Sequence, residues 1–364
     1  MSFTLLSYFF KLGQFLALTP PSVNCKTVTC ARKLHILSIS ALLTSAMVVS
    51  LTYQNFYVDD IPIKTAVSLL TDVNLLGLSL YPMTVLGLRK GHLWIDLIDK
   101  LKMTEYLVSV KNKKDRSRKA FLLCVLVNLV AFLVIVYRHY MWYLVGRWHK
   151  IMHYEIFYLL IYNKYIFELL LVVIVHMLSL RYKGIRRRLQ GYLKKNQSKI
   201  TSGNVPIQLI RKIECELCLL NKTVTLYNDM FGWPMFLMIS YTSFVIIDTV
   251  DSTILNTLRP HLFHAIIGTF LFLSWGVLTT LLLISMCHRV YREVDKILSL
   301  TCDFGQLFNN GAHDDDLQEF TNFVLENSPR FSAADFFQIG RSTILSMLGN
   351  VTSFLLVMIQ FRQR

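Results

Sequence analysis

The sequence has little charge and few of the residues that interrupt helices. Only 17% of its 364 residues are charged, against ~25% in ordinary soluble domains. A disordered chain needs high charge and low hydrophobicity, so that class is excluded. The 8 prolines and 15 glycines exclude a collagen, and 7 cysteines over this length exclude a small disulfide scaffold.

Apolar residues take the place of the missing charge. They make up 54% of the chain, above the ~45–50% of soluble domains, and the mean hydropathy is +0.45. One or two water-bounded cores cannot bury that much apolar surface, so a membrane protein is expected rather than a soluble enzyme. The chain has no Gly-rich phosphate loop, HExxH motif or nucleophile elbow, and we predict neither enzyme activity nor a cofactor.

Seven apolar stretches are long enough to cross a bilayer, which takes roughly 20 residues of helix. The sequence therefore predicts an all-α membrane protein with seven transmembrane helices. The predicted spans cover about 34–54, 62–88, 120–137, 156–180, 230–250, 262–286 and 342–361.

Lysine and arginine are distributed unequally between the two sets of loops. The N-terminal segment and the loops at 89–119, 181–229 and 287–341 hold 30 of the 38, and the opposite loops with the C-terminal tail hold 6. Because cytoplasmic loops collect Lys and Arg, we predict a cytoplasmic N-terminus and an extracellular C-terminus. G-protein-coupled receptors have the opposite orientation, which disfavours that class.

Basic and amphipathic segments flank the spans on the predicted cytoplasmic side. Arg186, Arg187 and Arg188 lie just beyond the fourth span, where anionic lipids of the inner leaflet attract basic residues. Lipid is therefore the predicted partner, and nucleic acid is not. The first 20 residues lack the basic start of a signal peptide, and we expect an amphipathic stub on the inner membrane surface or a frayed terminus.

Cysteine usage fits a reducing compartment. Six of the seven cysteines fall in predicted cytoplasmic segments, and Cys124 lies just inside the third span, so no structural disulfide is expected. Cys215 and Cys218 form a CxxC pair without a second pair at zinc-ligand spacing. The acidic run after His313 fits a solvated loop, and no metal site is predicted.

The C-terminal residues carry the most specific pattern. They contain Ser353-Phe354, five hydrophobic residues, and then Gln360-Phe361. This resembles the C-terminal signature of insect gustatory receptors, in which a Thr-Tyr pair, five hydrophobic residues and Gln-Phe follow one another. Ser353 is a mild departure from Thr, whereas Phe354 removes the phenol hydroxyl of Tyr. A second resemblance precedes the fifth span, where Asn228, Phe231 and Gly232 stand as in these receptors.

The resemblance implies four subunits around a central pore, cytoplasmic extensions packed into a shared anchor, and a ligand site in the outer half of the bundle. It divides the chain into a cytoplasmic N-terminal segment (1–33), spans one to four with the ligand-binding bundle (34–180), a basic cytoplasmic anchor (181–229), spans five and six (230–286), a cytoplasmic loop and anchor (287–341), and the pore-lining seventh span with a short outer tail (342–364).

The resemblance also implies which residues line the pore. Gln360 places an amide in an apolar span, where it needs polar partners or water. Val357 lies one turn inward on the same face, and a ring of four valines would form a hydrophobic constriction that Phe361 narrows further. Ordinary helix packing of Val357 and Gln360 is the alternative.

Polar and aromatic residues inside spans two to six are the candidates for ligand contact, because they are costly to bury without a purpose. They are Asp72, Asn163, Glu168, Tyr241, Asp248 and Trp275. Three of them have a structural alternative: Glu168 is spaced from Lys164 for an ion pair, Trp275 could serve packing, and Asp248 could serve as an interfacial cap.

The sequence and the resemblance together predict a gustatory receptor subunit in the plasma membrane of sensory neurons. It would be a ligand-gated, non-selective cation channel opened by a taste compound, bitter or aversive because the polar groups are too scattered for a sugar site. It would work as a homotetramer or with other receptor subunits. An odorant-receptor-type channel and a non-conducting subunit of a heteromeric receptor are the alternatives.

Overall fold

The computed structural model is almost entirely helical. It describes residues 2–20, 29–55, 62–107, 113–144, 148–200, 207–256, 263–308 and 314–362. In chain order the helices are α1 (Ser2–Phe15), α2 (Cys30–Asn55), α3 (Pro62–Tyr81), the π-helix η1 (Pro82–Arg89), α4 (Gly91–Met103), the 3₁₀ turn η2 (Glu105–Leu107), α5 (Lys113–Leu144), α6 (Trp148–Ile200), α7 (Ile207–Asn256), α8 (Phe263–Phe308), α9 (Asp314–Glu326) and α10 (Arg341–Arg362). Strands β1 (Ser332–Ala333) and β2 (Phe337–Gln338) pair antiparallel between α9 and α10.

Each of the seven stretches expected to cross the membrane lies on a helix. Within the described residues, six helices are long and apolar enough to span a bilayer, and they involve α2, α3 with η1, α6, α7, α8 and α10. The apolar part of α5, Phe121–Tyr137, is shorter. The expected all-α membrane fold is confirmed.

Pro82 divides the second expected span. The α-helix ends at Tyr81 and continues as the π-helix η1 up to Arg89. Proline has no amide hydrogen to donate to the α-helical ladder, which accounts for the changed hydrogen bonding from this point.

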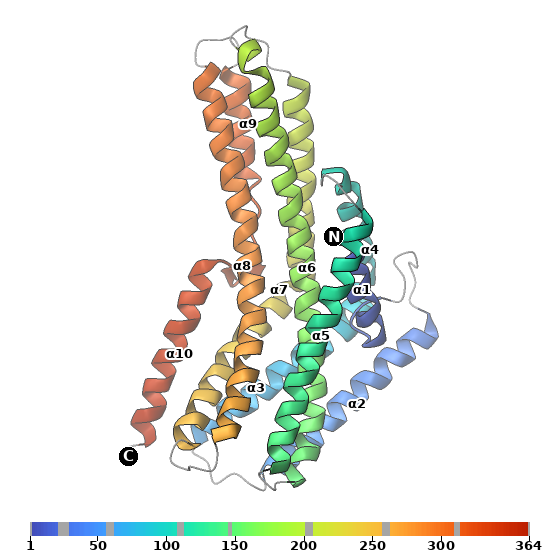
Figure 1. The fold of residues 1–364 in the computed structure, drawn as a ribbon, viewed down its shortest axis with the longest axis vertical. Coiled ribbons are helices and arrows are strands. Elements are labelled where there is room, and N and C mark those ends of the chain that lie inside the picture. The colour runs from blue at the N-terminus through green and yellow to red at the C-terminus, as the bar shows by residue number, and fades with distance from the viewer. Residues whose placement is uncertain are drawn as a thin grey trace.

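Helices α6, α7 and α8 continue well beyond their apolar parts, and Figure 1 shows them rising together past the other helices. They contain 53, 50 and 46 residues, whereas roughly 20 residues span a bilayer. Helix α9 packs against α8 and α7. We call residues 181–200, 207–229 and 287–308, together with α9, the extension bundle.

Charged side chains join the helices of the extension bundle. Arg186 Nε donates to Glu293 Oε2 at 2.9 Å between α6 and α8, and Arg188 Nη1 donates to Glu216 Oε1 at 3.0 Å between α6 and α7. The hydroxyl of Tyr106 donates to the same Glu216 oxygen at 2.7 Å. Burial, together with this hydrogen bond, raises the pKa of Tyr106 to about 12, so its hydroxyl remains a donor.

One face of the N-terminal helix is buried against the rest of the bundle. Leu5, Leu6, Phe9 and Phe10 are at most 7% exposed, and α1 packs against α6 and α5. Phe10 also meets Trp94 of α4 edge to face, with ring centroids 5.8 Å apart. The apolar face of this helix thus packs on protein, with an aromatic partner far along the chain.

The expected loop at 89–119 contains α4 and η2 in its described part. A single buried arginine ties this segment to α6. Arg181 is 0% exposed, and its guanidinium donates to the Leu101 carbonyl at 2.6 Å and to the Thr104 hydroxyl at 2.7 Å. The end of α4 is thus fixed against the start of the extension bundle.

Helix α10 stands at the edge of the bundle (Figure 1), where it packs on α7 and α8. Val351 and Met358 form a small apolar cluster with Val67 of α3 and Ile247 of α7. Much of the surface of α10 remains uncovered within the described chain, as Leu345 at 72% exposure illustrates.

Candidate functional site

Two intramembrane charges on α6 form an ion pair. Lys164 is 3% exposed and Glu168 is 0% exposed, and Lys164 Nζ lies 3.0 Å from Glu168 Oε1. The i, i+4 spacing predicts this pair. Because an isolated charge is costly to bury, each residue neutralises the other.

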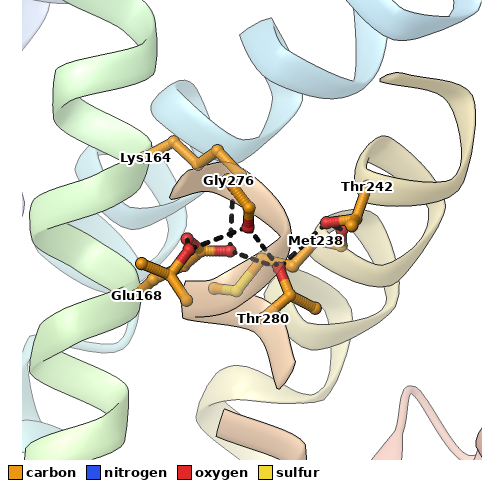
Figure 2. Close-up of polar contacts among 7 residues, drawn as sticks. Lys164, Glu168, Met238, Thr242, Gly276 and Thr280 are labelled. Atoms are coloured by element: carbon orange, nitrogen blue, oxygen red, sulfur yellow. Dashed lines mark hydrogen bonds and ion pairs between the residues drawn. The ribbon is translucent and has the colours of Figure 1, made fainter. Parts of the chain in front are cut away.

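Threonines of two further helices complete the coordination of Glu168. Thr279 on α8 donates to Glu168 Oε2 at 2.6 Å, and Thr280 donates to Oε1 at 3.1 Å. Thr280 is in turn hydrogen-bonded to Thr242 on α7, with their hydroxyl oxygens 2.9 Å apart. Figure 2 shows these contacts joining α6, α8 and α7. We define the polar core as Lys164, Glu168, Thr242, Thr279 and Thr280.

Two more of the ligand candidates border the polar core. The Lys164 Nζ atom lies 4.8 Å from the centroid of the Tyr241 ring, in a cation–π contact. Asn163 is 2% exposed, and its Oδ1 accepts no hydrogen bond from the described residues. A buried amide oxygen without a donor costs free energy, so this position suits the hydroxyl of a small ligand or a water molecule.

Trp275 belongs to an aromatic contact between α8 and α6. Its ring centroid lies 5.0 Å from that of Tyr165. The Tyr165 hydroxyl donates to the Val127 carbonyl at 3.3 Å, and the Tyr162 hydroxyl donates to Asn128 Oδ1 at 2.9 Å. Trp275 thus packs on α6, and the two tyrosines of α6 connect that helix to α5.

The last two ligand candidates form a pair of their own. Asp72 on α3 is 7% exposed, and its carboxylate interacts electrostatically with that of Asp248 on α7. Asp248 directly follows Ile247, so this pair lies beside the apolar contact of α7 with α10.

Sequence reasoning missed Thr242, Thr279 and Thr280. A threonine in an apolar helix usually returns its hydroxyl to a carbonyl one turn earlier, and composition does not reveal a different partner. The available signal was Glu168, because a buried carboxylate in a span needs donors. The adjacent hydroxyls at 279 and 280 supply two of them from 111 and 112 residues away.

No metal centre is formed by the part of the chain that the structure describes, since no three His, Cys, Asp or Glu residues come within reach of one ion. Cys215 is exposed and Cys218 is half-buried, and both are free thiols.

Helix α10 has two unlike faces. The buried face packs on the bundle and consists of Thr343, Met347, Val351 and Met358, each at most 7% exposed. The exposed surface carries the apolar side chains Leu345, Leu348, Leu356 and Ile359, and beside them small and polar residues recur at the spacing of one helical side. We call these exposed residues the polar stripe, namely Ser342, Ser346, Gly349, Ser353 and Gln360.

The residues expected to line a pore fall on or beside the polar stripe. Gln360 and Ser353 belong to it, and Val357 is 41% exposed on the same side. Phe354 is half-buried in the apolar cluster with α3 and α7, where a phenyl ring needs no hydroxyl. Phe361 lies on α10, and its side chain falls outside the described residues.

Comparisons with known proteins agree on one family and one fold. The family model described as "7tm Chemosensory receptor" matches residues 6–364. A comparison with curated proteins finds no match.

Two solved structures share the fold over nearly the whole chain. The insect olfactory receptor OR5 from Machilis hrabei in complex with eugenol superimposes with a TM-score of 0.66 at 15% identity, covering 98% of each chain. The structure of OR5 reported without eugenol gives a TM-score of 0.57 at 13% identity, again covering 98% of each chain. At these identities the likeness establishes the fold alone.

Proposed function

The chain belongs to the 7tm chemosensory receptor family, and from that premise we propose that it is a gustatory receptor subunit forming a ligand-gated cation channel. Its helices make it a multi-pass membrane protein. The proposal places it in the plasma membrane of sensory neurons, with the N-terminus inside and the C-terminus outside, as the distribution of Lys and Arg favours.

The observation that carries the channel proposal is the polar stripe of α10. The exposed amide of Gln360 is unfavourable against lipid hydrocarbon, because it lacks hydrogen-bond partners there. Another face of the same helix already packs on the subunit, so the stripe is free to face water. A water-filled axis shared by four copies supplies the stripe with partners and turns Val357 into a ring that can gate by dewetting.

The polar core supports the proposal of a small-molecule ligand within the bundle. Helices α7 and α8, which carry Tyr241 and the three threonines, also pack against α10. Helix α6, which carries Lys164, Glu168 and the buried Asn163, packs in turn against α7 and α8. A ligand that prefers one arrangement of these helices shifts the equilibrium of α10 toward conduction. A bitter or aversive organic compound is the proposed class.

An odorant receptor subunit is the second candidate, favoured by the likeness to OR5. Because that likeness concerns the fold alone, we give more weight to the Gln360-Phe361 ending, which resembles gustatory receptors.

Current recorded from cells that express this chain alone tests the proposal. Caffeine, denatonium and sucrose are applied to wild type, Val357→Ala and Gln360→Ala, with the exposed Leu126→Ala of α5 as a matched control. We expect a ligand-evoked cation current in wild type. In Val357→Ala we expect the ligand-independent current to rise about threefold or more. Smaller side chains widen the constriction and weaken its hydrophobic barrier.

Silence of all variants despite surface expression would contradict a self-sufficient channel. Co-expression with other receptor subunits then separates an obligate heteromer, whose current appears, from a non-conducting subunit, whose current does not.

A further inference from the structure

The hairpin β1–β2 carries α10 and is built around a tight turn. Ala334 and Asp335 have φ angles of 50° and 61°, in the left-handed region that non-glycine residues rarely adopt. The Ser332 hydroxyl donates to Asp335 Oδ1 at 2.9 Å and accepts from the Asp335 N–H at 2.7 Å. The neighbouring structure therefore holds the hairpin in one conformation at a cost in local strain.

The side chain of Asn228 on α7 holds the start of the first strand. Its Nδ2 donates to the Arg330 carbonyl at 2.6 Å, and its Oδ1 accepts from the Ser332 N–H at 3.2 Å. This pair of hydrogen bonds lets one amide side chain replace a missing backbone partner, and it links positions 102 and 104 residues apart.

Gly232, one turn further along α7, lets the hairpin approach the helix backbone. A Cβ atom at this position would lie 3.1 Å from the Ala334 nitrogen and 3.3 Å from its Cα. Both are backbone atoms that cannot rotate away, so a side chain here would push the hairpin from the helix by a few tenths of an ångström.

A second set of contacts seats the hairpin on α8. The Phe331 N–H donates to the Tyr291 hydroxyl at 2.8 Å, and the Phe331 ring meets Tyr227 of α7 edge to face at 5.6 Å. The Ile339 N–H donates to the Phe331 carbonyl at 2.8 Å, immediately before α10 begins. The segment that enters α10 is thus fixed at both of its ends.

From these contacts we infer that Asn228 and Gly232 are positioning residues for α10: they form a joint through which α7 sets the position of the helix that carries the gate. The same α7 contributes Thr242 to the polar core and Ile247 to the contact with α10. A movement of α7 in the bundle is therefore transmitted to α10 through two contacts, the hairpin and the apolar cluster at Ile247. The inference rests on the proposed function of α10 as the pore helix.

The test measures whether water reaches positions on either side of Val357. A cysteine is introduced at Gln360 or at Ser353, and a membrane-impermeant cationic methanethiosulfonate is applied from outside to intact cells. Gln360→Cys lies outward of Val357 and reports whether α10 faces water. Ser353→Cys lies inward, and its modification rate reports passage through the constriction. The chain without an introduced cysteine gives the background.

Asn228→Ala removes the two hydrogen bonds, and Gly232→Ala wedges the hairpin away from α7. Each is combined with Ser353→Cys. We expect both to change the modification rate at 353 in the same direction by about threefold or more, within the range that coupling mutations produce. The matched controls are Asn221→Ala, two turns earlier on α7, and Gly191→Ala, where a Cβ meets no atom within 4 Å. Both controls should leave the rate unchanged.

Surface biotinylation and the rate at Gln360→Cys show that each variant is folded and inserted. Asn228→Asp keeps the oxygen that accepts from the Ser332 N–H. Its modification rate at position 353 should therefore lie between those of wild type and Asn228→Ala. An unchanged rate at 353 in both joint variants, with normal reactivity at 360, overturns the joint and leaves the pore proposal standing. A lack of reactivity at 360 overturns the pore proposal and the joint with it.

Discussion

At the scale of single residues, the protein places two opposite charges in the middle of its helical bundle. Lys164 and Glu168 have little contact with solvent, and Glu168 has three donors around it. Such a pair is a weak source of stability when intact but a large liability when one partner is lost.

Glu168→Gln should therefore lower the free energy of unfolding by about 3–5 kcal/mol, because it leaves the Lys164 ammonium buried without a counter-charge. The double variant Lys164→Met/Glu168→Gln should recover most of this loss, since one of the two threonines can still donate to the amide oxygen and the other can accept from the amide nitrogen. The fraction of monodisperse protein after heating in detergent measures both. Lys222→Met on the exposed side of α7 serves as the control. Equal instability of the single and double variants would contradict the ion-pair account.

At the scale of elements, buried side chains fix the short helices beside the spans. Arg181 fixes the end of α4, and Phe10 fixes α1 through Trp94. Trp94 continues the contact to Phe231 of α7, with ring centroids 5.3 Å apart. The N-terminal helix thereby supports the same stretch of α7 that holds the hairpin.

Arg181→Met should destabilise the fold by about 2–3 kcal/mol, because it leaves the Leu101 carbonyl and the Thr104 hydroxyl without their buried donor. Arg187→Met removes an exposed arginine of the same helix and should change stability by less than about 0.5 kcal/mol. Thermal unfolding followed by size-exclusion chromatography compares the two. Similar losses of stability in both variants would indicate that the positive charge, and not these hydrogen bonds, stabilises the fold.

Phe10→Ala should cost about 3 kcal/mol, since a buried ring is replaced by a cavity against Trp94. Phe15 on the same helix is 77% exposed and provides the control, for which Phe15→Ala should be nearly neutral. Limited proteolysis of the N-terminus in detergent reports the release of α1. A helix equally protected in Phe10→Ala and wild type would contradict its anchoring role.

At the scale of the whole molecule, orientation decides which side of the membrane carries the extension bundle. An epitope tag at the N-terminus should stain only after cells are permeabilised, and a tag at the C-terminus should stain intact cells, because 30 basic residues flank the spans on one side and 6 on the other. A third tag, inserted at an exposed position of the extension bundle such as Gly191, should also stain only after permeabilisation. Staining of an N-terminal tag on intact cells would reverse the proposed topology and place the constriction at the inner mouth.

The sequence by itself determined the membrane class, the seven helical stretches and the family resemblance. Hydrocarbon requires every backbone polar group to be bonded within its own segment, so a span can be recognised from local composition alone. The pair Lys164–Glu168 was predictable for the same reason, since its partners share one helix face.

Only the tertiary structure decided which of the polar candidates come together and how α10 is held. Thr279 reaches Glu168, Asn228 reaches Arg330 and Ser332, and Phe10 reaches Trp94 across separations that no local pattern encodes. These contacts depend on which helices pack side by side, which is a property of the complementary surfaces of whole helices and not of any single segment. The same packing covers one face of α10 and leaves its polar stripe uncovered by the described part of the chain.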